Sequence, residues 1–461
     1  MSSPTLADLL VNHPATGAEP LLHSRDETLT ADAARREAQI FAERLREAGV
    51  ERSQGVALRM VNDPHAITAM FGVWLAGAVF VPLNARAPET EAEQILEHTR
   101  PAVLCTNGEF LRRSAPAQFD PEIAFVTSTS GTTGRPKPVQ HTHTGYLELL
   151  DRVIGPLRGQ AHEHVRRPAP NLVPVSLALN AGIYNVLFGL RAGAEIVIMN
   201  RFEPSEFADL VARFGIRSTV LPPAALVMLS DDSSISDLAP LRFVRSITAP
   251  LSPLQARRFS DRFGVTVLNG YGQAEIGEVI GWTAADARDY PEKIGAVGRP
   301  HPGVHVRLVD RDSDTGIGRL FVRPPSTAAG LDRGRLDADG YVDTGDLARI
   351  DDDRFVWVEG RAGDVINRGG NKVFPEQVEE VLRLSAQVRD AAVVGAPDER
   401  LGEVPVAFVV ADAEVADRDL FELCRQHLVP YKIPVAIHRV DALPRTDVGK
   451  VRRQELLDRL R

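Results

Sequence analysis

A run of small hydroxyl residues and glycines, Thr127-Ser-Thr-Ser-Gly-Thr-Thr-Gly-Arg-Pro-Lys137, follows directly on the apolar residues 123–126. The apolar residues predict a buried strand, and the run after them predicts a loop. Glycine lets the backbone approach a ligand closely, and successive N–H groups, hydroxyls and a lysine can together hold a polyanion. We therefore predict a phosphate-binding loop at the end of a buried strand. An ordinary surface turn is the alternative, because it has the same composition.

The loop belongs to neither of two common nucleotide-binding types. No G-x-x-x-x-G-K-[ST] sequence occurs anywhere in the chain, which excludes a P-loop kinase. The loop is not a dinucleotide-binding fingerprint either. Its ligand must therefore be inferred together with the rest of the chain.

Four further stretches follow the loop in the order Tyr271-Gly-Gln-Ala-Glu275, Tyr341-Val-Asp-Thr-Gly-Asp346, Gly360-Arg-Ala-Gly-Asp-Val-Ile-Asn-Arg-Gly-Gly370 and Pro444-Arg-Thr-Asp-Val-Gly-Lys450. The five stretches, in this order, resemble the motifs of the adenylate-forming superfamily, which contains acyl-CoA synthetases, stand-alone adenylation enzymes and luciferases. One such motif is weak evidence. Five in order extend from residue 127 to residue 450, so the resemblance covers nearly the whole chain.

Composition fits a soluble globular protein of 461 residues, which is too long for a single core and suggests two or three domains. The net charge of −9 argues against an electrostatic nucleic-acid binder, and no apolar run of 18 residues predicts a membrane span. We expect no signal peptide, because the first residues lack a basic region followed by an apolar core. Only Cys105 and Cys424 are present, which excludes a disulfide framework and fits a reducing cytoplasm.

The order of apolar segments predicts an α/β fold. Residues 30–49 predict an amphipathic helix capped by Thr30, and residues 56–60, 78–82 and 101–105 predict strands with a buried helix over residues 66–77. Strand, helix and strand at these spacings indicate a parallel sheet covered by helices. Further strands of a second sheet are predicted at residues 194–199, 218–221, 243–251 and 266–275.

The later segments complete the predicted architecture. Residues 317–323 and 355–360 predict strands of a small β subdomain, and residues 374–461 predict strands and helices of a separate C-terminal unit. We therefore expect a large N-terminal domain, residues 1–360, made of two α/β subdomains and a small β subdomain. A small, mobile α+β domain, residues 361–461, follows a hinge near Gly363.

The resemblance implies a role for each motif residue in binding ATP. Tyr271 would stack on adenine, Asp346 would accept both ribose hydroxyls, and Arg361 would contact ribose or phosphate. Glu275 would hold Mg²⁺ beside the phosphate oxygens and counts as a catalytic candidate. The complete expected ATP or AMP set is Thr127, Ser128, Ser130, Gly131, Thr132, Thr133, Gly134, Lys137, Asn269, Gly270, Tyr271, Gly272, Asp346 and Arg361.

The expected acyl pocket departs from the family pattern. Its candidate residues are Leu177, Leu179, Ile247, Thr248 and Ala274. The family often has histidine or an aromatic residue near the first two positions, small residues at the next two, and threonine at Ala274. The loss of that threonine hydroxyl, if nothing replaces it, removes a contact worth on the order of 10²-fold in rate. No acidic residue lies in residues 172–190, so an apolar aliphatic or aryl acid is favoured over an amino acid.

The C-terminal motifs imply a second set of roles. Lys450 would neutralise the charge that develops on the carboxylate and the α-phosphate. Gly369 and Gly370 would line the path of an incoming thiol after the C-terminal domain rotates about Gly363, whose flexibility suits a hinge. Taken alone, a lysine after a glycine is normally a solvated charge, so only the resemblance makes Lys450 the catalytic candidate.

Two histidine pairs suggest metal binding at first sight. His141 and His143 follow the loop, and His162 and His164 lie further on. We favour a structural role for the first pair and a solvated surface for the second, because no third ligand is apparent.

Together the residues predict an AMP-forming carboxylic acid–CoA ligase that uses ATP, Mg²⁺ and CoA. The closest alternative is the same adenylation followed by transfer to a carrier protein or an amine. A non-catalytic adenylate-binding protein with the same fold is a lesser alternative, which Ala274 favours and Lys137, Glu275, Asp346, Arg361 and Lys450 oppose.

Overall fold

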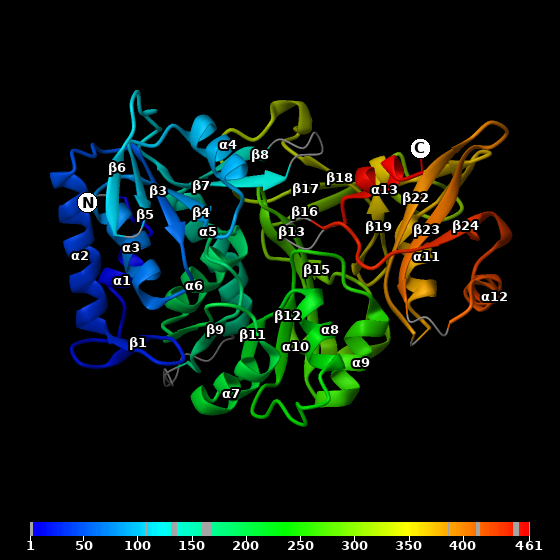
Figure 1. The fold of residues 1–461 in the computed structure, drawn as a ribbon, viewed down its shortest axis with the longest axis horizontal. Helices are drawn as coiled ribbons and strands as arrows, with labels where there is room; N and C mark the ends of the chain where they lie inside the picture. The colour runs from blue at the N-terminus through cyan, green and yellow to red at the C-terminus, as the bar shows by residue number, and fades with distance from the viewer. Residues whose placement is uncertain are drawn as a thin grey trace.

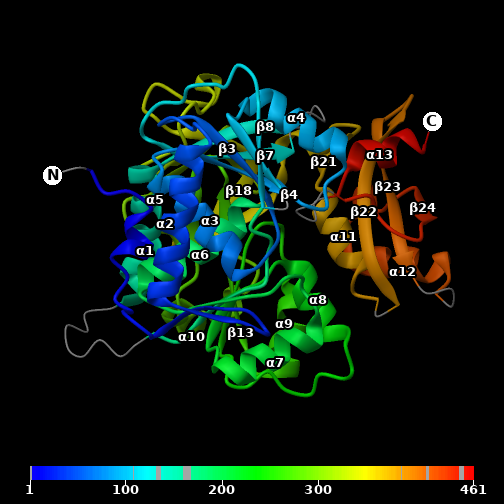
Figure 2. The ribbon, with the colours of Figure 1, turned by 60° about the vertical axis from the view of Figure 1, so that its left-hand side comes forward.

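The computed structural model describes residues 3–106, 108–130, 136–158, 168–385, 387–411, 415–445 and 451–460. Four β-sheets organise these residues. The described residues from 366 onwards form a lobe of their own, drawn in yellow-orange to red in Figures 1 and 2.

The first sheet is parallel at its centre and antiparallel at both edges. Its strand order is β6 (Glu109–Arg112), β5 (Val103–Thr106), β3 (Gly55–Met60), β4 (Val79–Asn84), β7 (Ile123–Ser130) and β8 (Pro136–Thr142). β5, β3, β4 and β7 run parallel, as the alternation of strands and helices predicts. β8 returns antiparallel to β7, so the predicted phosphate loop is the tip of a β-hairpin.

The second sheet collects strands from a long stretch of the chain. Its order is β15 (Arg299–Pro300), β14 (Gly277–Gly281), β13 (Thr266–Gln273), β12 (Phe243–Ser246), β11 (Ser218–Val220), β9 (Asn171–Val173), β10 (Ile196–Ile198), β1 (Pro20–His23) and β2 (Thr28–Thr30). The strands from β13 to β1 run parallel, and β14 folds back on β13 as a hairpin.

Ten helices of the described residues accompany these two sheets. They are α1 (Asp8–Val11), α2 (Ala31–Glu47), α3 (Pro64–Leu75), α4 (Glu89–Thr99), α5 (His143–Arg158), α6 (Asn180–Ala192), α7 (Pro204–Phe214), α8 (Pro223–Asp231), α9 (Pro253–Phe263) and α10 (Ala284–Asp289). One buried apolar cluster contains residues of α2, α3, α5, α6 and both sheets, so the two α/β units share a core.

Helix caps explain where two predicted helices begin. The Thr30 hydroxyl accepts from Ala33 N at 3.2 Å, as predicted for α2. α3 begins two residues before its predicted start because the Asp63 carboxylate caps it, accepting from Ala66 N at 2.6 Å.

One predicted strand is much shorter in the structure. β12 ends at Ser246, whereas the sequence predicted a strand to residue 251. Thr248 has φ +84° and Pro250 follows, so the chain leaves the extended conformation directly after the strand. A β-branched residue at positive φ is strained, which marks this turn as constrained by its surroundings.

The third and fourth sheets belong to the last third of the chain. The third is an antiparallel meander of β16 (His305–Val309), β17 (Gly318–Arg323), β18 (Val342–Ile350) and β19 (Val356–Arg361). The fourth has the order β21 (Asn371–Val373), β20 (Ile366–Arg368), β23 (Gly402–Ala411) and β22 (Val388–Asp398), with β24 (Ala436–Arg439) paired to β23. α11 (Pro375–Leu382), α12 (Asp417–His427) and α13 (Arg453–Asp458) complete the C-terminal lobe.

The predicted fold class is confirmed: the described residues form two α/β units, a small β unit and a C-terminal α+β unit. Of the helices in the described ranges, none has the length and apolar character needed to cross a membrane.

Candidate active site

Three residues from separate motifs meet at the junction of the second and third sheets. Asp346 of β18 lies directly opposite Arg361 of β19 in the strand register, and Asp346 Oδ1 is 2.8 Å from Arg361 Nε. The Tyr271 hydroxyl, on β13, donates to Asp346 Oδ2. The structure therefore brings together the residues expected to bind adenine, ribose and phosphate.

Gln273 joins this group, although no role was assigned to it from the sequence. Its Nε2 donates to Asp346 Oδ2 at 3.1 Å and to the Thr344 carbonyl at 2.8 Å. We call Tyr271, Gln273, Asp346 and Arg361 the nucleotide cluster. The sequence did offer one signal for Gln273, namely that it lies inside the motif around Tyr271.

Burial differs across the nucleotide cluster. The Asp346 side chain is 6% exposed, whereas that of Arg361 is 47% exposed. Burial and the neighbouring Asp346 charge raise the pKa of Tyr271, so its hydroxyl stays protonated and able to donate. A ribose that binds to Asp346 must therefore replace or share the hydrogen bonds from Tyr271 and Gln273.

The phosphate hairpin is only partly within the described residues. Thr127 pairs with Val139 across β7 and β8, and its buried hydroxyl lies 3.1 Å from His141 Nε2. Ser128 is half-buried, Lys137 is exposed on β8, and the backbone of Ser130 ends β7. Gly131, Thr132, Thr133 and Gly134 lie outside the described residues.

His141 and His143 have structural contacts. His141 stacks on Phe125 with ring centroids 4.4 Å apart, and burial lowers its pKa to about 3. His143 Nδ1 accepts from Leu6 N at 3.1 Å, and burial lowers its pKa to about 4. Both rings are therefore neutral at pH 7. His162 and His164 lie outside the described residues.

Glu275 lies at the tip of the β13–β14 hairpin, next to Ala274. Its Oε1 is 3.2 Å from Nη1 of Arg335, whose Nη2 donates to Gln273 Oε1 at 2.6 Å. Arg335 therefore connects Glu275 to the nucleotide cluster. No motif singled out Arg335, because it lies in a 3-10 turn far from Glu275 in sequence.

A short segment joins Glu275 to the phosphate hairpin. Ala328 N donates to the Glu275 carbonyl at 2.7 Å, and Ala329 N donates to the Gln140 carbonyl at 2.8 Å. A small pocket opens beside this segment, lined in part by Ala274, Glu275 and Thr327. The segment thus holds the expected magnesium carboxylate beside β8.

The donor set around Glu275 fits Mg²⁺ bound together with a nucleotide. Mg²⁺ prefers oxygen ligands and often takes one or two carboxylates, with phosphate oxygens and water completing its shell. Glu275 supplies one half-buried carboxylate. Within the described ranges, no group of three or more His, Cys, Asp and Glu residues is arranged to hold a metal alone.

The five expected acyl-pocket residues do not share one environment. Leu177 is fully buried in the core shared by the first two sheets, and Leu179 is half-buried just before α6. Ile247 is half-buried, Thr248 is exposed, and of these five residues Ala274 alone lines the small pocket.

Asn269, Gly270 and Gly272 shape the strand that carries Tyr271. Asn269 pairs with Ser246 of β12, and its side-chain oxygen accepts from Gly270 N at 3.0 Å. A Cβ atom on Gly272 would lie 2.1 Å from the Gly277 carbonyl oxygen, so this close turn of the hairpin requires glycine.

The residues expected at the hinge and along the thiol path follow Arg361 on other elements. Gly363 is exposed within the 3-10 turn Ala362–Asp364. Gly369 and Gly370 have φ +56° and +88° in the turn between β20 and β21. Lys450 lies outside the described residues.

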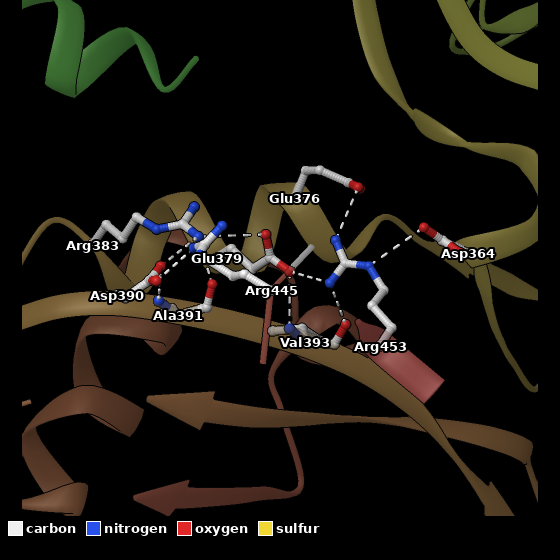
Figure 3. A network of polar contacts seen from close by, with 9 residues as sticks. All are labelled: Asp364, Glu376, Glu379, Arg383, Asp390, Ala391, Val393, Arg445 and Arg453. Atoms are coloured by element: carbon white, nitrogen blue, oxygen red, sulfur yellow. Dashed lines mark hydrogen bonds and ion pairs between the residues drawn. The ribbon is translucent and has the colours of Figure 1, made fainter. Parts of the chain in front are cut away.

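Three residues beyond Lys450, an arginine fixes α13 to the C-terminal lobe. Figure 3 shows Arg453 reaching Glu376, Glu379 and Asp364. Its Nη1 is 2.6 Å from Glu379, its Nη2 is 3.1 Å from Glu376, and its Nε is 3.4 Å from Asp364. Asp364 directly follows the expected hinge. We call Arg453 and these three carboxylates the Arg453 cluster.

Comparison with known proteins places these motifs in one family. The profile of the AMP-binding enzyme family matches residues 11–120 and 111–331, and the profile of the AMP-binding enzyme C-terminal domain matches residues 377–450. The chain is 29% identical to a 2-succinylbenzoate–CoA ligase of Bacillus licheniformis, over 91% of this chain and 92% of that protein.

Two further similarities extend over nearly the whole chain. The fatty acid–[acyl-carrier-protein] ligase ScoC of Streptomyces coeruleorubidus is 28% identical, over 95% of this chain and 93% of that protein. The structure of the amide bond synthetase McbA from Marinactinospora thermotolerans superposes with a TM-score of 0.83 at 26% identity, covering 99% of both chains. The chain belongs to the AMP-binding enzyme family and is an ATP-dependent, AMP-forming ligase of the acyl-CoA synthetase type.

Proposed function

We propose that this enzyme adenylates a carboxylic acid and then transfers the acyl group to the thiol of CoA. The observation that carries the proposal is the nucleotide cluster, in which Tyr271, Asp346 and Arg361 meet from three strands. The 2-succinylbenzoate–CoA ligase similarity over nine-tenths of both chains supports a thioester product.

In the first step, a carboxylate oxygen of the acid attacks the α-phosphorus of ATP. The bond from that phosphorus to the bridging oxygen breaks, and pyrophosphate leaves. Asp346 would accept the ribose hydroxyls, Arg361 would contact ribose or phosphate, and Tyr271 would present its ring to adenine. The phosphate hairpin, including Lys137, would hold the triphosphate.

Glu275 would hold Mg²⁺, which neutralises charge on the phosphate oxygens when it is bound. Its own contact with Arg335, at 3.2 Å, keeps the carboxylate near the nucleotide cluster before ATP arrives. The segment 326–329 fixes the hairpin tip to β8 and so orients Glu275 relative to the phosphate hairpin.

The second step requires a different arrangement around the same acyl-adenylate. We propose that residues 361–461 move as one domain about Gly363, relative to residues 1–360. One orientation would present Lys450 to the reacting carboxylate and α-phosphate. The other would present Gly369 and Gly370 to the entering thiol. The thiol sulfur then attacks the acyl carbon, AMP leaves, and the thiol proton passes to solvent.

A second acceptor class is supported by two of the similar proteins. ScoC is named as a ligase for an acyl-carrier protein, and McbA as an amide bond synthetase. The sequence similarity to ScoC and the structural similarity to McbA each extend over nearly the whole length of that protein. The second candidate function is therefore the same adenylation followed by transfer to a carrier-protein thiol or an amine.

Pyrophosphate release across a panel of carboxylic acids tests the proposal. Each acid is assayed with and without Mg²⁺, and the acyl-adenylate is then offered CoA, a phosphopantetheinylated carrier protein or an amine. We expect release to depend on acid and Mg²⁺, and thioester to form with CoA. Transfer only to the carrier or the amine would select the second candidate, and no acid-dependent release would contradict both.

A further inference from the structure

A group of polar and charged side chains is buried beside the β13–β14 hairpin. It consists of Arg152 (α5), Tyr184 (α6), Arg245 (β12), Glu278 (β14) and His301, which follows β15. Arg152 is 1% exposed, Glu278 5%, His301 6% and Arg245 12%. We call these five residues the buried cluster. They come from five different segments, so no single sequence motif predicts the cluster.

Glu278 is the carboxylate at the centre of the buried cluster. Its Oε1 lies 3.0 Å from Arg245 Nη1 and 3.2 Å from His301 Nε2. Burial alone would raise the pKa of Glu278, but Arg245 and His301 outweigh it and lower that pKa below its ordinary value. Glu278 is therefore ionised and balances the charge of Arg245.

Arg152 has no such partner. The nearest carboxylate recorded for it is Glu148, whose Oε1 is 3.9 Å from Arg152 Nε and which also accepts from the Ser326 hydroxyl. Its Nη2 reaches the Ile276 carbonyl only at 3.4 Å. A guanidinium that is almost fully buried without a close carboxylate is unusual, because burying a charge is costly unless it is paired.

Several polar atoms of the buried cluster have no hydrogen-bond partner among the described residues. They are Nε and Nη1 of Arg152, the hydroxyl of Tyr184 and Oε2 of Glu278. Burial and the charge of Glu278 raise the pKa of Tyr184, so its hydroxyl stays protonated and able to donate. The unpartnered atoms are mostly donors, and the two arginines face one fully buried carboxylate. The buried cluster therefore holds two guanidinium groups against one carboxylate and has more unpartnered donors than acceptors.

The buried cluster borders the region expected to hold the acyl group. A Cβ atom on Gly270 would lie 3.0 Å from Glu278 Oε1 and 3.0 Å from Cγ2 of Ile247, an expected acyl-pocket residue. A Cβ atom on Gly277 would contact Leu149 and lie 3.3 Å from Arg152 Nη2. Leu149 and Gly277 line the small pocket that contains Ala274 and Glu275. The donors thus lie just behind the expected position of the reacting carboxylate.

We propose that the acid substrate is a dicarboxylic acid, whose second carboxylate binds Arg152 and Arg245 beside the Tyr184 hydroxyl. This proposal rests on the adenylation proposed above and specifies its substrate. Guanidinium groups recognise carboxylates through paired charge-assisted hydrogen bonds, which would satisfy the free donors. The sequence favoured an apolar acid because residues 172–190 contain no acidic residue. The two arginines lie outside that stretch, on α5 and β12.

Matched acid pairs test the proposal, because each pair differs only in whether a methyl group replaces one carboxylate. The aliphatic pairs are malonate and propanoate, succinate and butanoate, glutarate and pentanoate, and adipate and hexanoate. The aromatic pair is terephthalate and 4-methylbenzoate. We expect at least one diacid to exceed its partner in kcat/KM for pyrophosphate release by about 10²-fold or more, because a site built for a polar group rejects the analogue that lacks it.

Arg152→Met is the informative variant. It removes a cation without leaving a close carboxylate unpaired, so we expect the melting temperature to stay the same or rise. The kcat/KM of the preferred diacid should fall by about 10-fold or more, while that of the matched monoacid stays the same or rises. Tyr184→Phe, which removes one hydroxyl only, should lower the same preference by a smaller factor. Arg191→Met is the control, because Arg191 lies on α6 but pairs with Asp151 at the surface.

Three results would contradict the dicarboxylic-acid proposal or the adenylation on which it rests. Monoacids accepted as well as diacids, or an equal loss for both acids in Arg152→Met, would overturn the proposal and make the buried cluster structural. A fall in melting temperature with unchanged acid preference would overturn it in the same way. If ATP binds but no acid releases pyrophosphate, the proposed adenylation itself fails, which the monoacid arm distinguishes from a wrong substrate class.

Discussion

The nucleotide cluster and the buried cluster are both groups of polar side chains on β13 and its neighbours, but they differ in how their polar atoms are satisfied. In the nucleotide cluster, Asp346 accepts from Tyr271 and Gln273 and pairs with Arg361, which is half exposed to solvent. In the buried cluster, Glu278 pairs with Arg245 and His301, whereas Arg152 has no close carboxylate and several donors remain unpartnered.

This difference indicates two ways of preparing a binding site. The nucleotide cluster is complete without its ligand, so a nucleotide must exchange hydrogen bonds that already exist. The buried cluster is incomplete, so an anionic group would add hydrogen bonds rather than replace them. We therefore expect the loss of the central carboxylate to cost more stability in the buried cluster, at Glu278, than in the nucleotide cluster, at Asp346.

The largest expected effect is on stability, from Glu278→Ala. This change leaves Arg245 buried without a carboxylate, and breaking a buried pair in this way costs about 3–5 kcal/mol. Urea unfolding followed by circular dichroism measures the loss. Asp346→Ala is the comparison, and its loss should be clearly smaller because water can solvate Arg361. Equal losses would show that the two clusters do not differ as described.

The next largest effect is on rate, from Lys450→Ala. Lys450 would stabilise negative charge only while the adenylate forms, and removing one such contact typically costs on the order of 10²–10³ in rate. Acyl-AMP formation from acid and ATP should therefore nearly stop. The same variant, given synthetic acyl-AMP and CoA, should form thioester at close to the parent rate.

Lys432→Ala is the matched control for that experiment. Lys432 also belongs to the C-terminal lobe, but its Nζ donates to Gln377 Oε1 at 2.7 Å. It should leave both half-reactions nearly unchanged. Equal damage to both steps in Lys450→Ala would contradict the two-orientation proposal and show that the nucleotide cluster works without a moving lysine.

A smaller effect is expected on nucleotide affinity, from Asp346→Ala. Hydrogen bonds to a charged group contribute about 1.5–3 kcal/mol, so ATP should bind about 10- to 10²-fold more weakly. Binding of 2′,3′-dideoxy-ATP should change much less, because it lacks the hydroxyls that Asp346 would accept. Asp343→Ala, on the same strand but paired with Arg319, is the control. An equal loss for both nucleotides would remove Asp346 from the ribose site.

The smallest expected effect is on the pH dependence of stability. It concerns the Arg453 cluster, in which carboxylates outnumber arginines, whereas arginines outnumber carboxylates in the buried cluster. In the Arg453 cluster, one arginine faces Asp364, Glu376 and Glu379. Burial, and the charges of Glu379 and Asp364, raise the pKa of Glu376 to about 7, although Arg453 acts in the opposite direction.

The folded state therefore holds a proton on Glu376 at pH values where the unfolded state has lost it. Stability should decline as pH rises from about 4.5 to about 7 and then level off. Glu376→Gln should flatten this part of the profile in urea unfolding at several pH values. Glu422→Gln, which breaks a surface pair with Arg425, should leave it unchanged.

Three residues of the nucleotide cluster could be grouped from the sequence because they lie in motifs that share one resemblance, although their role in binding a nucleotide stays a prediction. Tyr271, Asp346 and Arg361 were assigned to one nucleotide, and the structure places them in direct contact. The partners Gln273 and Arg335 were missed, because hydrogen bonding between a hairpin tip and a distant turn depends on three-dimensional packing.

The buried cluster could not be predicted in the same way. Arg152, Tyr184 and Arg245 are ordinary residues separated by tens of positions, and only packing of α5, α6 and β12 brings them together. The available signal was a charged residue inside an apolar strand, as at Arg245 in β12 and Glu278 in β14. Burying a charged side chain costs free energy unless the charge is paired, so a charged residue in an apolar strand indicates a specific partner.

The attachment of Arg453 to Asp364 has a mechanical consequence. Asp364 lies one residue beyond Gly363, and Arg453 lies three residues beyond Lys450, so one ion pair ties the two ends of the C-terminal lobe together. Under the rotation proposed about Gly363, α13 would therefore turn together with the residues that directly follow the pivot.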